Sequence, residues 1–286
     1  MSQRRPAESL FAKLQDPVSE NANESSRVLL LAAHPDDETI GASCVLGRVS
    51  DCTVIYLTDG APRDPLWRSP HVSGSRESYA CVRAEEAASA LELVGISAER
   101  ISFLGAVDQE SIYELQTLVE DFMQAVIRIQ PSVIVTHPYE GGHPDHDTAA
   151  LVARLALRCS EQQTGFVPEL LEMTSYHASD GQRVSGEFLP WQGPDPGDST
   201  PVILKLSAAE RATKTRMLGC YVSQWQVLSE FPLEPESLRV APLYDFSRPP
   251  HPGPLWYERL QWPLSGQRWR ELAAAGIAQF GELACR

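Results

Sequence analysis

Histidine and aspartate residues gather in two short stretches of the chain. The first reads AAHPDDE over residues 32–38, and the second reads THPYEGGHPDH over residues 136–146. Four of the seven histidines lie in these stretches. Two imidazoles and one carboxylate around an open fourth position form a typical hydrolytic zinc site. The stretches supply suitable donor atoms on His34, Asp36, Asp37, His143, Asp145 and His146.

An apolar run of strand length comes directly before each stretch. RVLLLAA (27–33) and SVIVTH (132–137) are continuous apolar runs, which is typical of strands buried on both faces of a sheet. In an open parallel sheet, ligands bind beyond the carboxyl ends of the strands, where the strand order reverses. We therefore expect the two stretches to meet in one crevice, although they lie far apart in the sequence.

Strands and helices alternate along the first part of the chain. This alternation implies right-handed βαβ units and a mostly parallel sheet flanked by helices, an α/β fold. We expect further strands at 52–58 and 101–105, and helices at 39–49, 76–94, 111–130 and 147–159.

The chain divides into three predicted parts. Residues 1–26 are polar, and we expect a mobile N-terminal arm in which ESLFAKL packs loosely at most. Residues 27–230 form the predicted catalytic domain. Dense prolines from Phe231 to Leu255 favour extended chain over regular elements. We therefore expect residues 231–286 to be an irregular C-terminal extension packed on the same domain, with a last helix at 266–279.

The composition excludes several classes of function. A net charge of −14 argues against a nucleic-acid partner and against a polybasic membrane anchor. No segment approaches the apolar length of a membrane span, and no secretory signal is visible. The six cysteines form no C-x-x-C pair, which favours reduced thiols and a cytoplasmic location. The composition leaves the oligomeric state open.

Turn formation alone does not explain two His and Asp clusters. A single His-Pro at a strand end is usually a turn, but packing imidazoles beside carboxylates costs desolvation energy unless they bind something. A metal lowers the pKa of a water molecule and polarises a carbonyl group, and a spare carboxylate can accept the proton. The spacing thus favours a metal centre without deciding which donors are ligands.

Four motifs resemble one known family, the PIG-L/LmbE-like deacetylases. The specific ones are AHPDDETIG (33–41) and HPDH (143–146), and the weaker ones are VRAEEAASALELVGI (82–96) and KTRMLGCYVSQ (214–224). The resemblance implies a Rossmann-like α/β fold. It also implies a zinc hydrolase that acts on N-acetylated amino sugars and related acyl amides, so the expected partner is a small molecule.

The resemblance assigns roles to individual residues. It makes His34, Asp37 and His146 the zinc ligands, and Asp36 the general base that accepts the proton of the attacking water. His143 would stabilise the oxyanion or protonate the leaving amine. Asp145 would orient an imidazole.

Other residues have two interpretations each. Arg83 could contact substrate, or it could pair with Glu86. Asp59 and Tyr139 could line the pocket, or they could form a turn and pack against the sheet. Two tryptophans, Trp67 and Trp225, could stack on a sugar ring or pack into the core.

Three alternative functions remain. The chain could be a catalytically silent, metal-binding member of the fold, or an amidase acting on a non-sugar conjugate. A nucleotide-binding oxidoreductase is disfavoured, because the first strand-to-helix turn lacks G-x-G-x-x-G and places carboxylates where a pyrophosphate would bind. We expect loops 59–75 and 179–200 and the C-terminal extension to set the specificity. Zinc is the expected metal, although iron or cobalt can occupy similar sites.

Overall fold

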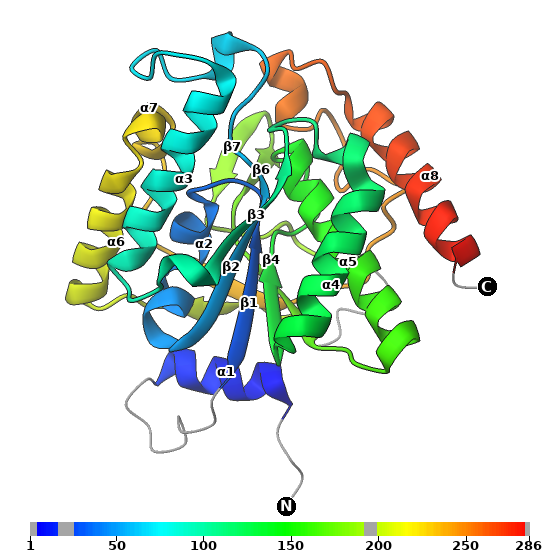
Figure 1. Cartoon of the computed structure of the whole chain (residues 1–286), viewed down its shortest axis with the longest axis horizontal. Coiled ribbons are helices and arrows are strands. Elements are labelled where there is room, and N and C mark those ends of the chain that lie inside the picture. The colour runs from blue at the N-terminus through cyan, green and yellow to red at the C-terminus, as the bar shows by residue number, and fades with distance from the viewer. Residues whose placement is uncertain (1–4, 17–25, 192–198, 284–286) are drawn as a thin grey trace, which may run out of the picture.

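A computed structural model of the chain describes residues 5–16, 26–191 and 199–283. Its centre is a seven-stranded sheet with the order β3-β2-β1-β4-β5-β9-β8, and helices cover both faces (Figure 1). A separate hairpin consists of β6 (Tyr176–Ser179) and β7 (Gln182–Ser185). The strands of the sheet are β1 (Arg27–Ala32), β2 (Asp51–Thr58), β3 (Ile101–Ala106), β4 (Val133–Thr136), β5 (Glu169–Met173), β8 (Val202–Leu204) and β9 (Glu236–Val240).

The strand order reverses between β1 and β4. From β1 the chain proceeds to β2 and then β3 on one side, whereas β4 and β5 lie on the other side, and all these neighbours pair in parallel. This confirms the Rossmann-like, mostly parallel α/β sheet. The carboxyl ends of β1 and β4 are therefore adjacent at the position where ligands bind in such folds.

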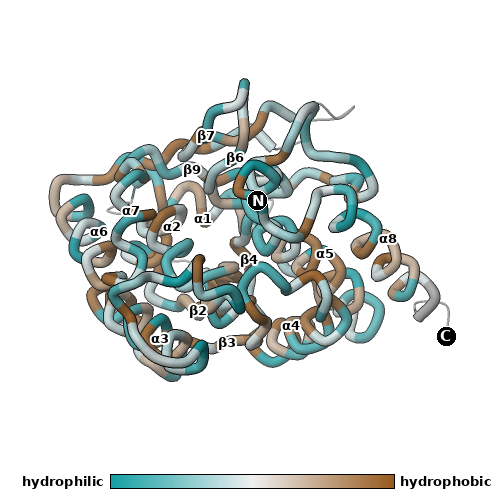
Figure 2. Tube along the Cα trace, turned by 90° about the horizontal axis from the view of Figure 1, so that it is seen from above, coloured by the Kyte–Doolittle hydropathy of each residue, from teal (hydrophilic) through white to brown (hydrophobic). Residues whose placement is uncertain are grey.

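The hydrophobic core lies in two layers, one on each face of the sheet. Side chains alternate along β1, so that Val28 and Leu30 enter one layer while Leu29 and Leu31 enter the other. Viewed from above, the helices of the two layers lie on opposite sides of the strands (Figure 2). The first layer contains α2 (Asp37–Arg48), α3 (Arg76–Glu92) and α6 (Ala208–Cys220), and the second contains α4 (Leu115–Ile129), α5 (Pro144–Thr164) and α8 (Gly266–Leu283).

The N-terminal segment is more ordered than its polar sequence predicts. Residues Pro6–Gln15 form helix α1, whose Ala7, Leu10 and Leu14 are buried in the first layer. Their spacing places them on one helix face, and Pro6 suits the first helical position. The expectation of a loosely packed arm is therefore wrong for residues 6–15. The rest of the expected arm, 1–4 and 17–25, lies outside the described residues.

The C-terminal part contributes a strand to the central sheet. Strand β9 pairs antiparallel with both β5 and β8, so that Leu238 lies opposite Met173 and Val202. The expected boundary at residue 230 therefore divides one sheet. Prolines flank this strand without entering it, and the proline-rich composition of the surrounding segment concealed it. The expected last helix is present as α8.

Candidate metal centre and its cavity

The turn after β1 is fixed by hydrogen bonds between its backbone and acidic side chains. The backbone N–H of His34 donates to Asp37 Oδ2 at 2.8 Å, and that of Asp36 donates to Glu38 Oε2 at 3.0 Å. Asp36 has φ 137° and ψ −29°, a backbone region that favours glycine. Helix α2 begins directly afterwards at Asp37, so the turn places three acidic residues in a row around His34.

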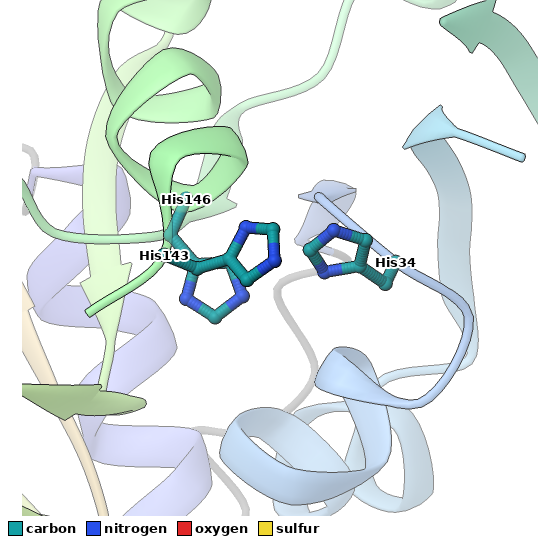
Figure 3. A group of neighbouring side chains, drawn as sticks. All are labelled: His34, His143 and His146. Carbon is teal, nitrogen blue, oxygen red and sulfur yellow. The ribbon is translucent and has the colours of Figure 1, made fainter. Parts of the chain in front are cut away.

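The second stretch forms the start of helix α5. The helix begins at Pro144, three residues before the expected Asp147, because proline fits the first helical position. His143 caps the helix, and its Nδ1 accepts the backbone N–H of Asp145 at 3.1 Å. A neutral His143 therefore carries its ring proton on Nε2. Figure 3 shows that His143 and His146 extend from this helix start toward His34 on the turn after β1.

Asp37 joins the two stretches. Its Oδ2 lies 3.1 Å from His34 Nδ1, and its Oδ1 lies 3.1 Å from His146 Nε2. Bond lengths of about 2.0–2.1 Å place two ligand atoms about 3.3 Å apart in a tetrahedral zinc site. His146 Nε2 is buried and has no hydrogen-bond partner among the described residues, while its Nδ1 lies 3.2 Å from Ser175 Oγ. Asp37 and His146 thus lie close enough to share one divalent ion, and His34 adjoins them through Asp37. The three expected ligands taken together do not form a group in which one ligating atom of each residue lies within 4.8 Å of the others.

Two neighbouring histidines lie close to the same position. The ligating atoms of His34, His143 and His146 all lie within 4.8 Å of one another, as do those of Asp37, His137 and His146. His137 Nε2 accepts the backbone N–H of Ala33 at 3.0 Å. His143 has only Nε2 free, because Nδ1 caps the helix.

The charge states of the aspartates differ because their partners differ. Burial acts to raise the pKa of Asp37, but the imidazoles of His146 and His137 outweigh it and hold that pKa well below its ordinary value. Burial raises the pKa of Asp36 well above its ordinary value, although Arg83 opposes the shift. An ionised Asp37 suits a metal ligand, and a more basic Asp36 suits a proton acceptor.

Asp145 contacts His34 on the side of the ring opposite Asp37. Its Oδ2 lies 3.1 Å from His34 Nε2 and accepts the backbone N–H of Gln109 at 2.6 Å. Its Oδ1 accepts the hydroxyl of Ser111 at 2.5 Å. The carboxylate therefore contacts the ring nitrogen of His34 that faces away from Asp37, the position of a group that orients a ligand.

Asp108 was missed by the sequence interpretation. It follows β3, and its Oδ1 lies 3.3 Å from His34 Nε2 and 3.8 Å from His143 Nε2. Burial lowers the pKa of His34, but the carboxylates of Asp108, Asp145 and Asp37 outweigh it and hold that pKa well above its ordinary value. A wider rule, an acidic residue just after any predicted strand of the sheet, could have found Asp108 as well.

Arg83 lies at the site, but its partner is not Glu86. Its side chain is buried and lies 3.1 Å from Asp36 Oδ2, and it also donates to the backbone carbonyl of Pro35. Glu86 instead accepts the backbone N–H of Ser223 at 2.8 Å and its hydroxyl at 2.6 Å. Arg83 thus holds the proposed base in place.

Tyr139 and Asp59 do not line the cavity, so the candidate role of these two residues in substrate binding is not supported. The ring of Tyr139 stacks on Trp269 with centroids 5.3 Å apart, and its hydroxyl donates to the Arg248 carbonyl at 2.8 Å. Asp59 pairs with Arg76 at 2.5 Å at the start of the long loop. Both side chains follow strands, but local packing turns them away from the crevice.

The site opens into a cavity of about 410 Å³. The expected ligands His34, Asp37 and His146 line it together with Asp36, Arg83 and His143. Trp67 also lines it, whereas Trp225 does not and is 60% exposed. Asp108 lines it as well, and so do Tyr176, Arg183, Trp256 and Trp262, which no sequence signal marked.

Among the described residues, none of the helices combines the length and the apolar character that crossing a membrane requires.

Comparison with known proteins links the first half of the chain to one group of enzymes. Residues 29–157 match the family model described as PIG-L, GlcNAc-PI de-N-acetylase. The chain is 29% identical over 180 residues to 1D-myo-inositol 2-acetamido-2-deoxy-alpha-D-glucopyranoside deacetylase 1 of Catenulispora acidiphila, covering 54% of each chain. It is 30% identical over 151 residues to diacetylchitobiose deacetylase of Thermococcus kodakarensis, covering 50% of this chain and 53% of the relative. The chain thus spans about half the length of the curated relatives it matches.

Solved structures share the fold over a longer part of the chain. The zinc-inhibited form of teicoplanin deacetylase aligns with a TM-score of 0.51 at 16% identity, covering 75% of this chain and 97% of that one. The A40926 pseudoaglycone deacetylase aligns with a TM-score of 0.51 at 19% identity, covering 72% and 86%. At these identities the likeness supports the fold assignment alone.

Proposed function

Since residues 29–157 match the family model of the PIG-L GlcNAc-PI de-N-acetylases, we propose that the chain is a zinc-dependent hydrolase that removes an acetyl group from the amide nitrogen of an amino-sugar-type small molecule. The curated relatives named above are deacetylases of N-acetylglucosamine-containing molecules, which supports this substrate class.

One observation carries the proposal. The carboxylate of Asp37 lies between the imidazoles of His34 and His146, 3.1 Å from each, and lines the cavity. Asp36 and His143 line the same cavity, and simple metal binding requires neither of them. A catalytically silent metal-binding protein would therefore not need these two side chains in the cavity.

In the proposed mechanism, His34, Asp37 and His146 hold the ion. A bound zinc ion supplies positive charge that polarises the scissile carbonyl and makes the attacking water more acidic. Asp36 accepts a proton from this water, and its raised pKa favours that step. His143 stabilises the oxyanion or protonates the departing nitrogen. The C–N bond breaks, acetate leaves with the oxygen of the water, and the amine keeps the transferred proton.

The proposal is tested by metal analysis together with acetate release from N-acetylglucosamine-type substrates. We expect roughly one zinc per chain and loss of activity with a chelator. Asp36→Asn should lower kcat by about 10²–10⁴-fold, the usual contribution of a general base, with metal retained. Asp51→Asn is the matched control, because Asp51 pairs with Arg27 and Arg100 at the opposite end of the sheet.

Each alternative gives a different result. Full activity of Asp36→Asn would show that the assigned base is wrong. Bound zinc without acetate release from any substrate would favour the silent metal-binding protein. Acetate release from N-acetylated amines but not from sugars would favour the amidase of non-sugar conjugates.

A further inference from the structure

Two tryptophans extend the site outward from His143. The ring of Trp262 lies edge-on to His143, with centroids 4.6 Å apart and an interplanar angle of 69°. The ring of Trp67 in turn lies edge-on to Trp262, with centroids 5.7 Å apart and an angle of 82°. Both tryptophans line the cavity. We call the pair Trp67 and Trp262 the indole wall.

The two halves of the indole wall come from distant parts of the chain. Trp67 ends a short 3-10 turn, Pro65–Trp67, in the long loop after β2, and Asp64 caps this turn. Trp262 follows the turn Tyr257–Leu260 in the C-terminal part. The two indole rings therefore come together only when the C-terminal segment packs beside the loop that follows β2.

Contacts with a glycine turn fix the C-terminal segment beside the catalytic histidines. The backbone N–H of Trp256 donates to the carbonyl of Gly141 at 2.9 Å, and Leu255 is buried against the same turn. Gly141 has φ 69°, and a Cβ there would lie 2.6 Å from Leu255 Cδ2. The turn that leads into HPDH thus provides the docking position for the segment that carries Trp262.

The cavity lining is different around His146. Tyr176 lies edge-on to His146 with centroids 5.3 Å apart, and Phe231 lies edge-on to Tyr176. Arg183 lies over the Phe231 ring and pairs with Glu230 at 2.9 Å, and this ion pair also lines the cavity. Polar groups that can bind hydroxyls therefore lie on this side, whereas the indole wall offers apolar surface.

The indole wall continues to the outer surface as apolar residues. Trp67 is 37% exposed, and its neighbour Leu66 is 77% exposed. Exposed apolar side chains at the mouth of a polar site are typical of surfaces that bind a ligand.

We propose that Trp67 and Trp262 determine specificity by binding an apolar group, aryl or alkyl, carried on the amine part of the substrate. The inference rests on the proposed function, in which His143 contacts the scissile amide. An acetyl group is too short to extend from His143 past Trp262 to Trp67. The part of the substrate that reaches the indole wall is therefore attached through the nitrogen, and the wall offers it stacking and burial in place of hydrogen bonds.

The test compares methyl and phenyl glycosides of N-acetylglucosamine, which differ only in the apolar group. Dissociation constants are measured by calorimetry in an Asp36→Asn background, and kcat/KM is measured in the active enzyme. The proteins are the parent, Trp67→Ala, Trp262→Ala and Trp225→Ala. Trp225 is the matched control because it is exposed near the cavity without lining it.

We expect the parent and Trp225→Ala to prefer the phenyl glycoside about tenfold, the size expected for packing one aromatic ring against two others. Trp67→Ala and Trp262→Ala should reduce the preference to about twofold or less. Trp67 lies in a partly exposed loop, so its variant keeps the test valid if Trp262→Ala fails to fold. Equal use of both glycosides by the parent would overturn the inference and leave the deacetylase intact. A preference that survives both substitutions would also overturn it. Absence of binding and turnover with either glycoside would instead refute the proposed function.

Discussion

Replacing Asp36 by glycine should leave the protein more stable than replacing it by alanine, the reverse of the usual order. Asp36 has φ 137° and ψ −29°, a conformation that is strained for any residue with a Cβ atom. Such strain costs on the order of 1–3 kcal/mol. Glycine relieves it, but loses about 0.5–1 kcal/mol because its unfolded chain is more flexible. The net expectation is a free energy of unfolding about 1 kcal/mol higher for Asp36→Gly than for Asp36→Ala.

Other effects of the two substitutions cancel in this comparison. Both remove the carboxylate and leave Arg83 with the Pro35 carbonyl, and both abolish the proposed base. The assay is urea unfolding of chelated protein followed by circular dichroism, so that metal affinity does not contribute. Ala274→Gly in the exposed part of α8 is the control, and it should lower stability by about 0.5–1 kcal/mol. Greater stability of Asp36→Ala than of Asp36→Gly would show that the turn is not strained.

Two further predictions concern helix α6. Lys214→Met should lower the free energy of unfolding by about 3–5 kcal/mol, because it leaves the buried Glu236 carboxylate without its cation, 2.7 Å away. The double variant Lys214→Met/Glu236→Gln should recover part of this loss, and a loss below about 1 kcal/mol for the single variant in urea unfolding would contradict the reasoning. Ser207→Ala should cost about 1 kcal/mol, because Ser207 and Glu210 form a capping box, whereas Ser207→Thr should be nearly neutral. Equal thermal midpoints of Ser207→Ala and the parent would argue against the cap.

The fold and the convergence of the two His and Asp stretches could be predicted because their signals are local and strong. The strands at 27–33 and 132–137 are continuous apolar runs, and such runs are typical of strands covered on both faces. Parallel strands that neighbour each other end at the same edge of the sheet. His34, Asp37 and His146 belong to the segments that follow those strands, which implied that they lie close together.

The directions of other side chains could not be predicted. Asp59, Asp108 and Tyr139 all follow strands of the same sheet, yet only Asp108 lines the cavity. The direction depends on hydrogen bonds of the turn, such as the pair of Asp59 with Arg76, and these are formed with residues distant in sequence. Strand β9 was hidden for a similar reason: its charged residues Glu236 and Arg239 are buried beside partners on other elements.

The C-terminal half positions the site through buried polar contacts as well as through the sheet. Tyr221 donates to Glu38, the residue that holds the backbone of Asp36. Lys214 donates to the carbonyl of Ile40 in the first turns of α2, at 2.7 Å. Ser223 donates to Glu86 on α3, the helix that carries Arg83. The motif KTRMLGCYVSQ therefore has a physical meaning, because its polar side chains lock helix α6 and the following turn against the two helices that bear the proposed base and its arginine. A substitution in this motif should consequently alter the geometry at Asp36 without contacting the proposed metal ligands.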